Sequence, residues 1–231
     1  MLKAVIFDID GTLVDSVDFH ARAWQETFRR YGREVPFEAV RHQIGKGGDQ
    51  LMPVFLPEDE IAERGEEIET FRKELFRREY LPSVQAFPAV RDLFERLRHD
   101  GKRIALASSA KGDELERHQK VTGIADLIEV ATSSDDAERS KPHPDIFRAA
   151  LQRLGHVRPA EVLVIGDTPY DAEAAGRAGL RTIGVLCGGF PEDELRAAGC
   201  VAVYRDPQDL LDRYDVSPLR ETPAAAAKAR R

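Results

Sequence analysis

The sequence predicts an α/β fold, in which a Rossmann-like, doubly wound parallel sheet carries an inserted α-helical cap. Short apolar runs alternate with helical patterns along most of the 231 residues. Near-continuous apolar runs are typical of parallel strands that are covered on both faces. Alternation of strand and helix favours a parallel sheet with right-handed crossovers. The alternation breaks once, over a long segment with helical patterns alone, and this segment predicts the cap.

The strands and helices of the core are predicted in a regular order. We expect strands at residues 3–8, 103–107, 127–131, 162–165, 182–186 and 201–204. We expect helices at residues 89–98, 113–121, 144–154 and 170–178. Most successive strands are therefore joined by a helical crossover, as parallel pairing requires.

The predicted cap runs from Ser16 to about Pro82, where we find no good strand pattern. Apolar side chains share one helical face in its first part, at Val17, Ala21, Trp24, Phe28 and Tyr31. A crossover needs only about a dozen residues, so a connection this long is an insert. We expect residues 16–82 to form the cap, and residues 1–15 and 83–217 to form the α/β core.

The alanine-rich end of the chain, residues 218–231, has little to bury and is expected to be disordered. A helix is the alternative, but a helix of ~12 to 15 residues is marginal alone. We therefore place the end of the core at residue 217.

Composition and charge narrow the class of protein. The chain is 42% hydrophobic and 32% charged, which is ordinary for a globular protein. Its formal net charge of −7 argues against a dominant nucleic-acid footprint. No apolar run approaches the ~20 residues of a membrane span, and no signal peptide opens the chain. Cys187 and Cys200 lack metal-ligand spacing, so we expect both to be reduced thiols. Together these features predict a cytoplasmic protein that binds neither nucleic acid nor membrane.

Two carboxylates follow the first predicted strand. Asp8 and Asp10 are two residues apart, so on an extended chain they point to the same side, and Gly11 lets the chain turn away. One carboxylate can attack as a nucleophile while the other moves protons, and a divalent cation would relieve their repulsion. An Asp-Gly turn with solvated acids is the alternative, but the flanking strand is apolar.

Polar residues also follow other predicted strands. Ser108 and the amides of the next helix resemble an anion site, although Ser108 taken alone is better explained as a helix-capping serine. Lys141, in a proline-stiffened loop, can neutralise a phosphoryl group, although a lone lysine is usually solvated. Asp167 is placed to bind metal, and Asp171 can hold a metal-bound water or brace Lys141. Ligands of open α/β sheets bind beyond the carboxyl ends of the strands, so these groups should meet at one edge.

At these residues the chain resembles the haloacid dehalogenase superfamily over roughly residues 1–213. The stretch from Asp8 to Thr12 is similar to its first motif, Ser108 to its second, Lys141 to its third, and Gly166-Asp167 with Asp171 to its fourth. The position of the insert resembles the subgroup with an α-helical cap, which includes phosphoglycolate phosphatase and β-phosphoglucomutase.

The resemblance implies a mechanism. Asp8 would attack phosphorus and become an aspartyl phosphate, while Asp10 protonates the leaving alcohol and later takes a proton from water. Mg²⁺ would be held by the Asp8 carboxylate, the Asp10 backbone carbonyl and Asp167. The phosphoryl oxygens would be held by Ser108, Ser109 and Lys141, with Thr12 and Asp171 behind them.

The cap contains one loop that is expected to read the substrate. Gly45, Lys46 and Gly47 interrupt its helices, so backbone can approach a ligand and the lysine can face the phosphate pocket. A flexible connection with a solvated lysine is the alternative. His20 resembles a histidine near the hinge of sugar-phosphate relatives, but a packed or capping histidine fits as well.

We therefore expect a phosphoric monoester hydrolase that uses Mg²⁺ and acts on a small phosphorylated metabolite of the phosphoglycolate or sugar-phosphate type, as a monomer or homodimer. A phosphosugar mutase is the alternative, and it is disfavoured because such mutases usually carry Glu-Asp where this chain has Gly166-Asp167. A non-enzymatic phospho-aspartate switch is more remote, because receiver domains are shorter and lack a cap.

Overall fold

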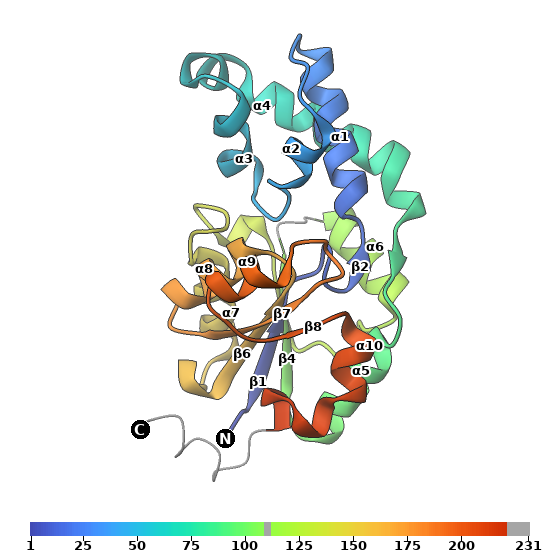
Figure 1. Ribbon diagram of the computed structural model, residues 1–231, viewed down its shortest axis with the longest axis vertical. Helices are drawn as coiled ribbons and strands as arrows, with labels where there is room; N and C mark the ends of the chain where they lie inside the picture. Colours follow the sequence, from blue (N-terminus) through green and yellow to red (C-terminus); the bar gives the residue numbers. More distant parts are fainter. Residues whose placement is uncertain (109–111, 221–231) are drawn as a thin grey trace.

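A six-stranded sheet forms the centre of the molecule (Figure 1). The computed structural model describes residues 1–108 and 112–220. The strands are β1 (Ala4–Phe7), β4 (Arg103–Ala107), β5 (Val130–Thr132), β6 (Val162–Gly166), β7 (Arg181–Val185) and β8 (Cys200–Tyr204). They pair in the order β5-β4-β1-β6-β7-β8, and every pair is parallel. The predicted α/β fold class is confirmed.

Helices cover both faces of this sheet. They are α5 (Val90–His99), α6 (Gly112–Thr122), α7 (Asp145–Leu154), α8 (Pro169–Arg177), α9 (Glu192–Ala197) and α10 (Pro207–Asp212). Single 3₁₀ turns lie at Ser134–Asp136, Pro159–Glu161, Tyr214–Val216 and Pro218–Arg220. The helices α5 and α10 share one apolar cluster with the sheet, and α7 and α8 share another.

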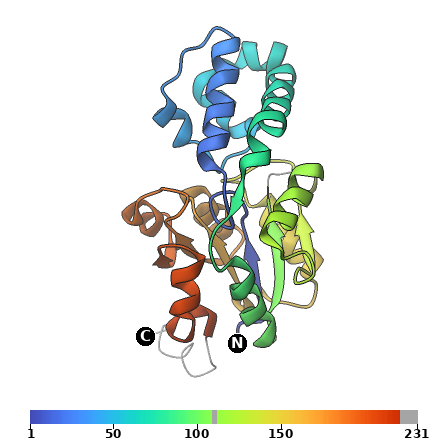
Figure 2. The ribbon, with the colours of Figure 1, turned by 90° about the vertical axis from the view of Figure 1, so that its right-hand side faces the viewer.

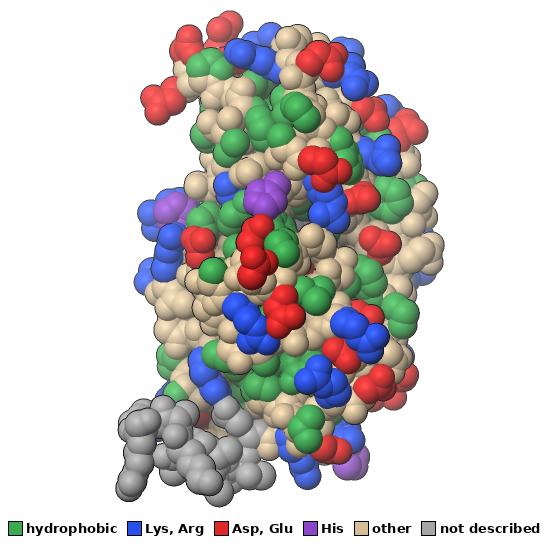
Figure 3. All heavy atoms as spheres, in the orientation of Figure 1, with side chains coloured by type: hydrophobic (Ala, Val, Ile, Leu, Met, Phe, Trp, Pro, Cys, Tyr) green, Lys and Arg blue, Asp and Glu red, His purple; other side chains and the backbone are tan. Residues whose placement is uncertain are grey.

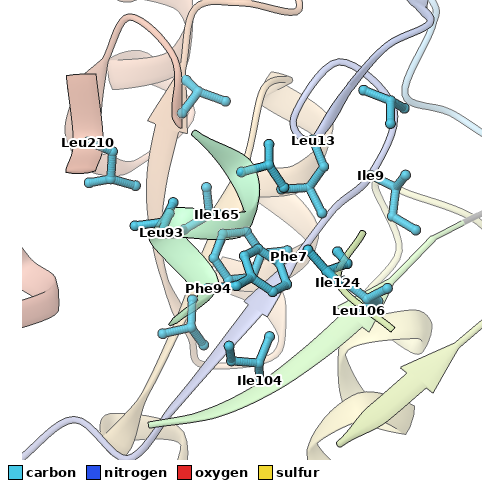
Figure 4. Close-up of a cluster of buried hydrophobic side chains, with 14 of the residues drawn as sticks. Phe7, Ile9, Leu13, Leu93, Phe94, Ile104, Leu106, Ile124, Ile165 and Leu210 are labelled. Atoms are coloured by element: carbon cyan, nitrogen blue, oxygen red, sulfur yellow. The ribbon is translucent and has the colours of Figure 1, made fainter. Parts of the chain in front are cut away.

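The central strand β1 supplies side chains to both clusters. Phe7 packs with Phe94 of α5 in the cluster that Figure 4 shows, at 4.5 Å between ring centroids. Ile6 belongs to the opposite cluster, with Phe147 of α7. Successive residues of a strand alternate between faces, so β1 must be apolar throughout. Each fully buried side chain of this size contributes about 1.5–3 kcal/mol.

A helical layer lies over the carboxyl ends of the strands (Figures 1 and 2). It contains α1 (Val17–Arg30), α2 (Phe37–Arg41), α3 (Gly48–Phe55) and α4 (Glu58–Leu75), which continues through Phe76–Tyr80 and Leu81–Ser83. The short strands β2 (Val14–Asp15) and β3 (Gln85–Ala86) pair antiparallel where the layer joins the core. The layer has its own apolar cluster, which includes Trp24 and Phe28 of α1.

Two sequence expectations differ from the structure. The strand expected at 127–131 begins only at Val130, because Leu127 closes a turn by donating its backbone N–H to the carbonyl oxygen of Ile124. Residues 218–220, expected to be disordered, form a 3₁₀ turn because Leu219 is fully buried in the core cluster. The expectation for residues 221–231 lies outside the described part of the chain.

The surface carries charges of both signs. On the face that Figure 3 shows, acidic and basic side chains are interspersed over the helical layer and the core. Within residues 1–108 and 112–220, no helix has the length and apolar character of a membrane span. The interspersed charges leave no large patch of one sign on the face that Figure 3 shows.

Candidate active site

The carboxyl ends of the central strands bring the predicted acidic residues together. β1 pairs with β6 so that Phe7 lies opposite Ile165, and Asp8 continues the ladder by donating its N–H to the carbonyl oxygen of Ile165 at 2.9 Å. Asp167 therefore lies beside Asp8, and both are buried. Ser108 follows the neighbouring strand β4 and is also buried.

Lys141 joins this group from the loop before α7. Its buried ammonium donates a hydrogen bond to Oδ1 of Asp8 and lies 2.7 Å from Oδ1 of Asp171. The two carboxylates hold the pKa of Lys141 above its ordinary value although burial opposes this. Lys141 and Ser108 also line the same small hollow beside Gly47 of the helical layer. The structure therefore places the predicted phosphate-binding residues Ser108 and Lys141 together, whereas Ser109 lies outside the described residues.

Asp171 is held by the start of α8. Its Oδ2 accepts hydrogen bonds from the backbone N–H and the hydroxyl of Thr168, at 3.1 and 2.7 Å. The Thr168 hydroxyl oxygen in turn accepts from the Asp171 backbone N–H at 3.2 Å, which completes a capping box. Asp171 therefore reaches Lys141 from a fixed position.

One carboxylate oxygen of Asp167 has no hydrogen-bond partner among the described residues. The hydroxyl of Thr12 donates to its Oδ1 at 2.8 Å. Its Oδ2 is buried and accepts no hydrogen bond from the described residues. A buried carboxylate oxygen without a donor is costly unless a cation contacts it.

The residues present fit a divalent cation. Carboxylate oxygens of Asp8, Asp167 and Asp171 lie within 4.8 Å of one another. Burial raises the pKa of Asp167 well above its ordinary value, and the charges of Asp171 and Asp8 add to this. Burial also raises the pKa of Asp8, against the opposing charge of Lys141. A hard cation with oxygen ligands, such as Mg²⁺, would offset this excess of negative charge.

Asp10 has a different environment at the joint between core and helical layer. Its Oδ1 accepts from the Ser16 hydroxyl at 2.6 Å and lies 3.1 Å from Nε2 of His20 and 3.9 Å from Nε2 of His118. Burial alone would raise the pKa of Asp10, but the two imidazoles and these hydrogen bonds hold it below its ordinary value. Asp10 is therefore held in its ionised form.

His20 connects α1 to this joint. Its ring stacks on Phe76 at 3.9 Å between centroids, and its Nε2 faces Asp10. His20 therefore packs against the helical layer, as the interpretation of a packed histidine predicts. It also lines the cavity that contains Asp8.

The loop of Gly45, Lys46 and Gly47 lies directly against the core. An added Cβ at Gly45, whose φ is +105°, would come 2.6 Å from a methyl carbon of Thr168, and one at Gly47 would come 2.0 Å from the Ser140 hydroxyl. Glycine is therefore required for this close approach. Lys46 lines the cavity, donates to Oε1 of Gln43 at 2.5 Å and lies 4.7 Å from the centroid of the Tyr170 ring.

A cavity of about 250 Å³ lies between the helical layer and the sheet edge. Its walls include Asp8 and Asp10 from the core and His20, Lys46 and Arg72 from the layer. This volume is below the ~300–1,000 Å³ of pockets that hold drug-sized ligands, so it suits a small metabolite.

Sequence reasoning missed three residues at this site. Gly188 presses its backbone against Asp167, since an added Cβ would lie 1.7 Å from Oδ2. The Gly188-Gly189 pair after a predicted strand was a usable signal, because paired glycines permit close approach. His118 and Arg72 gave no such signal, because each lies within an ordinary helical pattern.

Comparison with known proteins agrees with this geometry. Residues 5–185 match the family model described as haloacid dehalogenase-like hydrolase. The chain belongs to this family. It is similar to the pyrophosphatase PpaX of Oceanobacillus iheyensis, with 30% identity over 185 residues, 80% of this chain and 83% of that protein.

Further relatives extend the match over most of the chain. A phosphorylated carbohydrates phosphatase of Thermotoga maritima is 27% identical over 215 residues, 91% of this chain and 97% of that protein. The crystal structure of a hydrolase from Pseudomonas syringae superposes with a TM-score of 0.83 and 30% identity, covering 93% of this chain and 98% of that one. The fold of this hydrolase is therefore shared with that solved structure over nearly the whole chain.

We predict that Gly188→Ala weakens metal binding without unfolding the hydrolase. The new Cβ must displace Asp167, and disturbing a residue that supports a metal ligand typically costs about 10- to 100-fold in affinity. Titration of activity with Mg²⁺ should show this shift in the half-saturating concentration.

Gly176→Ala is the matched control, because no atom lies within 4 Å of its added Cβ. An unchanged Mg²⁺ titration for Gly188→Ala would contradict the assigned position of Asp167.

Proposed function

We propose that this hydrolase is a Mg²⁺-dependent phosphatase that cleaves a small phosphate monoester through an aspartyl phosphate on Asp8. One observation carries the proposal: a buried carboxylate at a strand end is held by Lys141 and lies beside the unpartnered Oδ2 of Asp167. Such a site combines a positioned nucleophile, a positive charge for phosphoryl oxygens and an oxygen ligand for a metal.

The proposed reaction has two steps. In the first, a carboxylate oxygen of Asp8 forms a bond to phosphorus, the ester P–O bond breaks, and Asp10 gives a proton to the leaving oxygen. In the second, water attacks phosphorus and gives a proton to Asp10 while the Asp8–phosphate bond breaks. The surroundings of Asp10 favour its ionised form in the free protein, so the first step requires that Asp10 is protonated when the substrate is bound.

Magnesium has a defined place in this proposal. The Asp8 carboxylate, the Asp10 backbone carbonyl and Asp167 would hold it, and it would supply charge neutralisation for the phosphoryl group. Lys141 keeps Asp8 oriented, and Asp171 keeps Lys141 in place. Ser108 would donate its hydroxyl to a phosphoryl oxygen.

The choice of phosphatase over mutase has a steric argument. An added Cβ at Gly166 would come 2.6 Å from the Cβ and Cγ of Asp171. A glutamate before Asp167, as the mutases usually carry, would therefore displace the residue that braces Lys141. The names of the relatives, a pyrophosphatase and a phosphorylated carbohydrates phosphatase, support hydrolysis of a small phosphorylated metabolite.

We predict that Asp8→Asn folds but loses at least ~10³-fold in turnover, as when one member of a catalytic unit is removed. Phosphate release from a panel of small esters measures the loss, and circular dichroism checks the fold. Asp15→Asn, at an exposed aspartate of β2, is the control and should retain activity. Near-normal turnover by Asp8→Asn would contradict the mechanism.

We predict that activity requires Mg²⁺ and that Ca²⁺ replaces it poorly. Mg²⁺ enforces octahedral geometry at about 2.1 Å, whereas Ca²⁺ takes more ligands at longer distance and would misplace Asp8 for attack. Assays after chelation, with each ion restored separately, measure this. Full activity in the chelated protein would remove the assigned role of Asp167.

We predict that Lys46→Ala lowers kcat/KM for the physiological ester about 10- to 100-fold, or ~1.4–2.7 kcal/mol. The loss for p-nitrophenyl phosphate should be much smaller, because Lys46 faces the cavity from the helical layer rather than from the phosphate site. Steady-state kinetics with both esters measure the difference.

Lys73→Ala is the control for Lys46→Ala. Lys73 lines the same cavity, but its ammonium lies 2.6 Å from Glu69 and is already paired. Equal losses on both esters would indicate that Lys46 contacts the phosphate group itself. No loss on either ester would support the alternative that Lys46 is a solvated lysine in a flexible loop.

A further inference from the structure

Arg72 is a cation of the cavity wall that lacks an anionic partner. It lies in the last turn of α4 and lines the cavity with Asp8 and Asp10. Its guanidinium carbon lies 5.2 Å from the centroid of the Trp24 ring, which is the contact that holds it in place. Its Nε is buried without a hydrogen-bond partner in the described part of the chain.

Two of the other lysines described around the cavity are paired with carboxylates. Lys141 lies between the carboxylates of Asp8 and Asp171, and Lys73 pairs with Glu69. Lys46 donates only to the neutral amide oxygen of Gln43. For Arg72, no carboxylate of the described residues lies within ion-pair distance. Among the described residues, Arg72 and Lys46 therefore both present positive charge to whatever occupies the cavity, and Arg72 is the one whose Nε is buried without a hydrogen-bond partner.

Charge and burial make this arrangement costly without a ligand. Arginine stays protonated in proteins, so its charge cannot be lost on burial. Burial lowers the pKa of Arg72, and the more distant charges of Glu114, Glu69 and Asp10 only partly oppose this. Arg72 is only partly exposed, and a charge that is partly removed from water is unfavourable unless it is paired. A substrate that supplies the missing anion would recover this cost on binding.

We infer that Arg72 binds a second anionic group on the leaving alcohol, so that the physiological substrate is a small phosphate ester whose alcohol itself carries a carboxylate or another phosphate. The planar guanidinium matches either oxyanion through two parallel N–H···O bonds. The Trp24 ring lies against the guanidinium without any ligand present. The inference rests on the proposed function and specifies its substrate class.

A purely structural role for Arg72 makes a different prediction. If Arg72 only packs on Trp24, removing its charge should affect all esters alike through the stability or closure of the helical layer. If Arg72 binds an anion, the loss should fall on anionic esters alone. The ratio of two kcat/KM values on one protein separates these cases.

The experiment compares matched esters that differ in one group. One pair is 3-phosphoglycerate and glycerol 3-phosphate, which differ by a carboxylate. The other is ethane-1,2-diyl bisphosphate and 2-hydroxyethyl phosphate, which differ by a second phosphate. Each is assayed with Mg²⁺ on the wild type, on Arg72→Met, which keeps the length that covers Trp24, and on Arg72→Lys. Lys73→Met, at the neighbouring paired cation, is the control.

We expect the wild type to prefer the anionic member of one pair by about 10- to 100-fold, as a charge-assisted pair supplies. Arg72→Met should abolish that preference with little change for the neutral member, Arg72→Lys should restore part of it, and Lys73→Met should keep it. The pair that shows the preference identifies the anion as carboxylate or phosphate.

The inference is overturned if the wild type hydrolyses p-nitrophenyl phosphate with Mg²⁺ but shows no anionic preference in either pair. It is also overturned if Arg72→Met lowers both members of a pair equally. In both cases the proposed phosphatase function stands. Failure of the wild type on every ester, p-nitrophenyl phosphate included, would instead remove the proposed function.

Discussion

The active-site edge depends on one buried ammonium that two carboxylates share. Lys141 donates to Asp8 and lies 2.7 Å from Asp171, which itself caps α8. Removing one partner from a buried ion pair costs about 3–5 kcal/mol, because the other charge is left uncompensated. Lys141 therefore ties the residue after β1 to the start of α8 and fixes the orientation of the proposed nucleophile.

This single cation does not balance the acids around it. Asp8, Asp167 and Asp171 contribute three carboxylates within a few ångströms, and one oxygen of Asp167 has no donor. The imbalance is resolved by a divalent cation in the proposed mechanism. The same reasoning applies across the cavity, where Arg72 forms no ion pair with a described carboxylate and is influenced only by the more distant charges of Glu114, Glu69 and Asp10. A metal ion would supply the positive charge that balances the acids. An anionic substrate would supply the negative charge that balances Arg72.

The sequence predicted the parts of the site that depend on strand register. Asp8 and Asp167 follow apolar strands, so parallel pairing brings them together wherever the exact strand ends fall. It did not predict contacts that form only when the helical layer packs on the core. The position of Arg72 in the cavity wall is such a case, because its neighbours in the sequence do not distinguish it from an arginine exposed to solvent. Burial of Leu219 was missed for the same reason, since its neighbours are distant in sequence.

The most direct test of a phosphoryl group on Asp8 is to trap it. In Asp10→Asn the second step should stall for want of a proton acceptor, while p-nitrophenyl phosphate needs no protonation of its leaving group. Acid-quenched protein is digested, and mass spectrometry locates the phosphate. The account predicts Mg²⁺-dependent release of about one p-nitrophenol per site with phosphate on the peptide that contains Asp8. The same release with no phosphate on Asp8, or with phosphate on another residue, would contradict it.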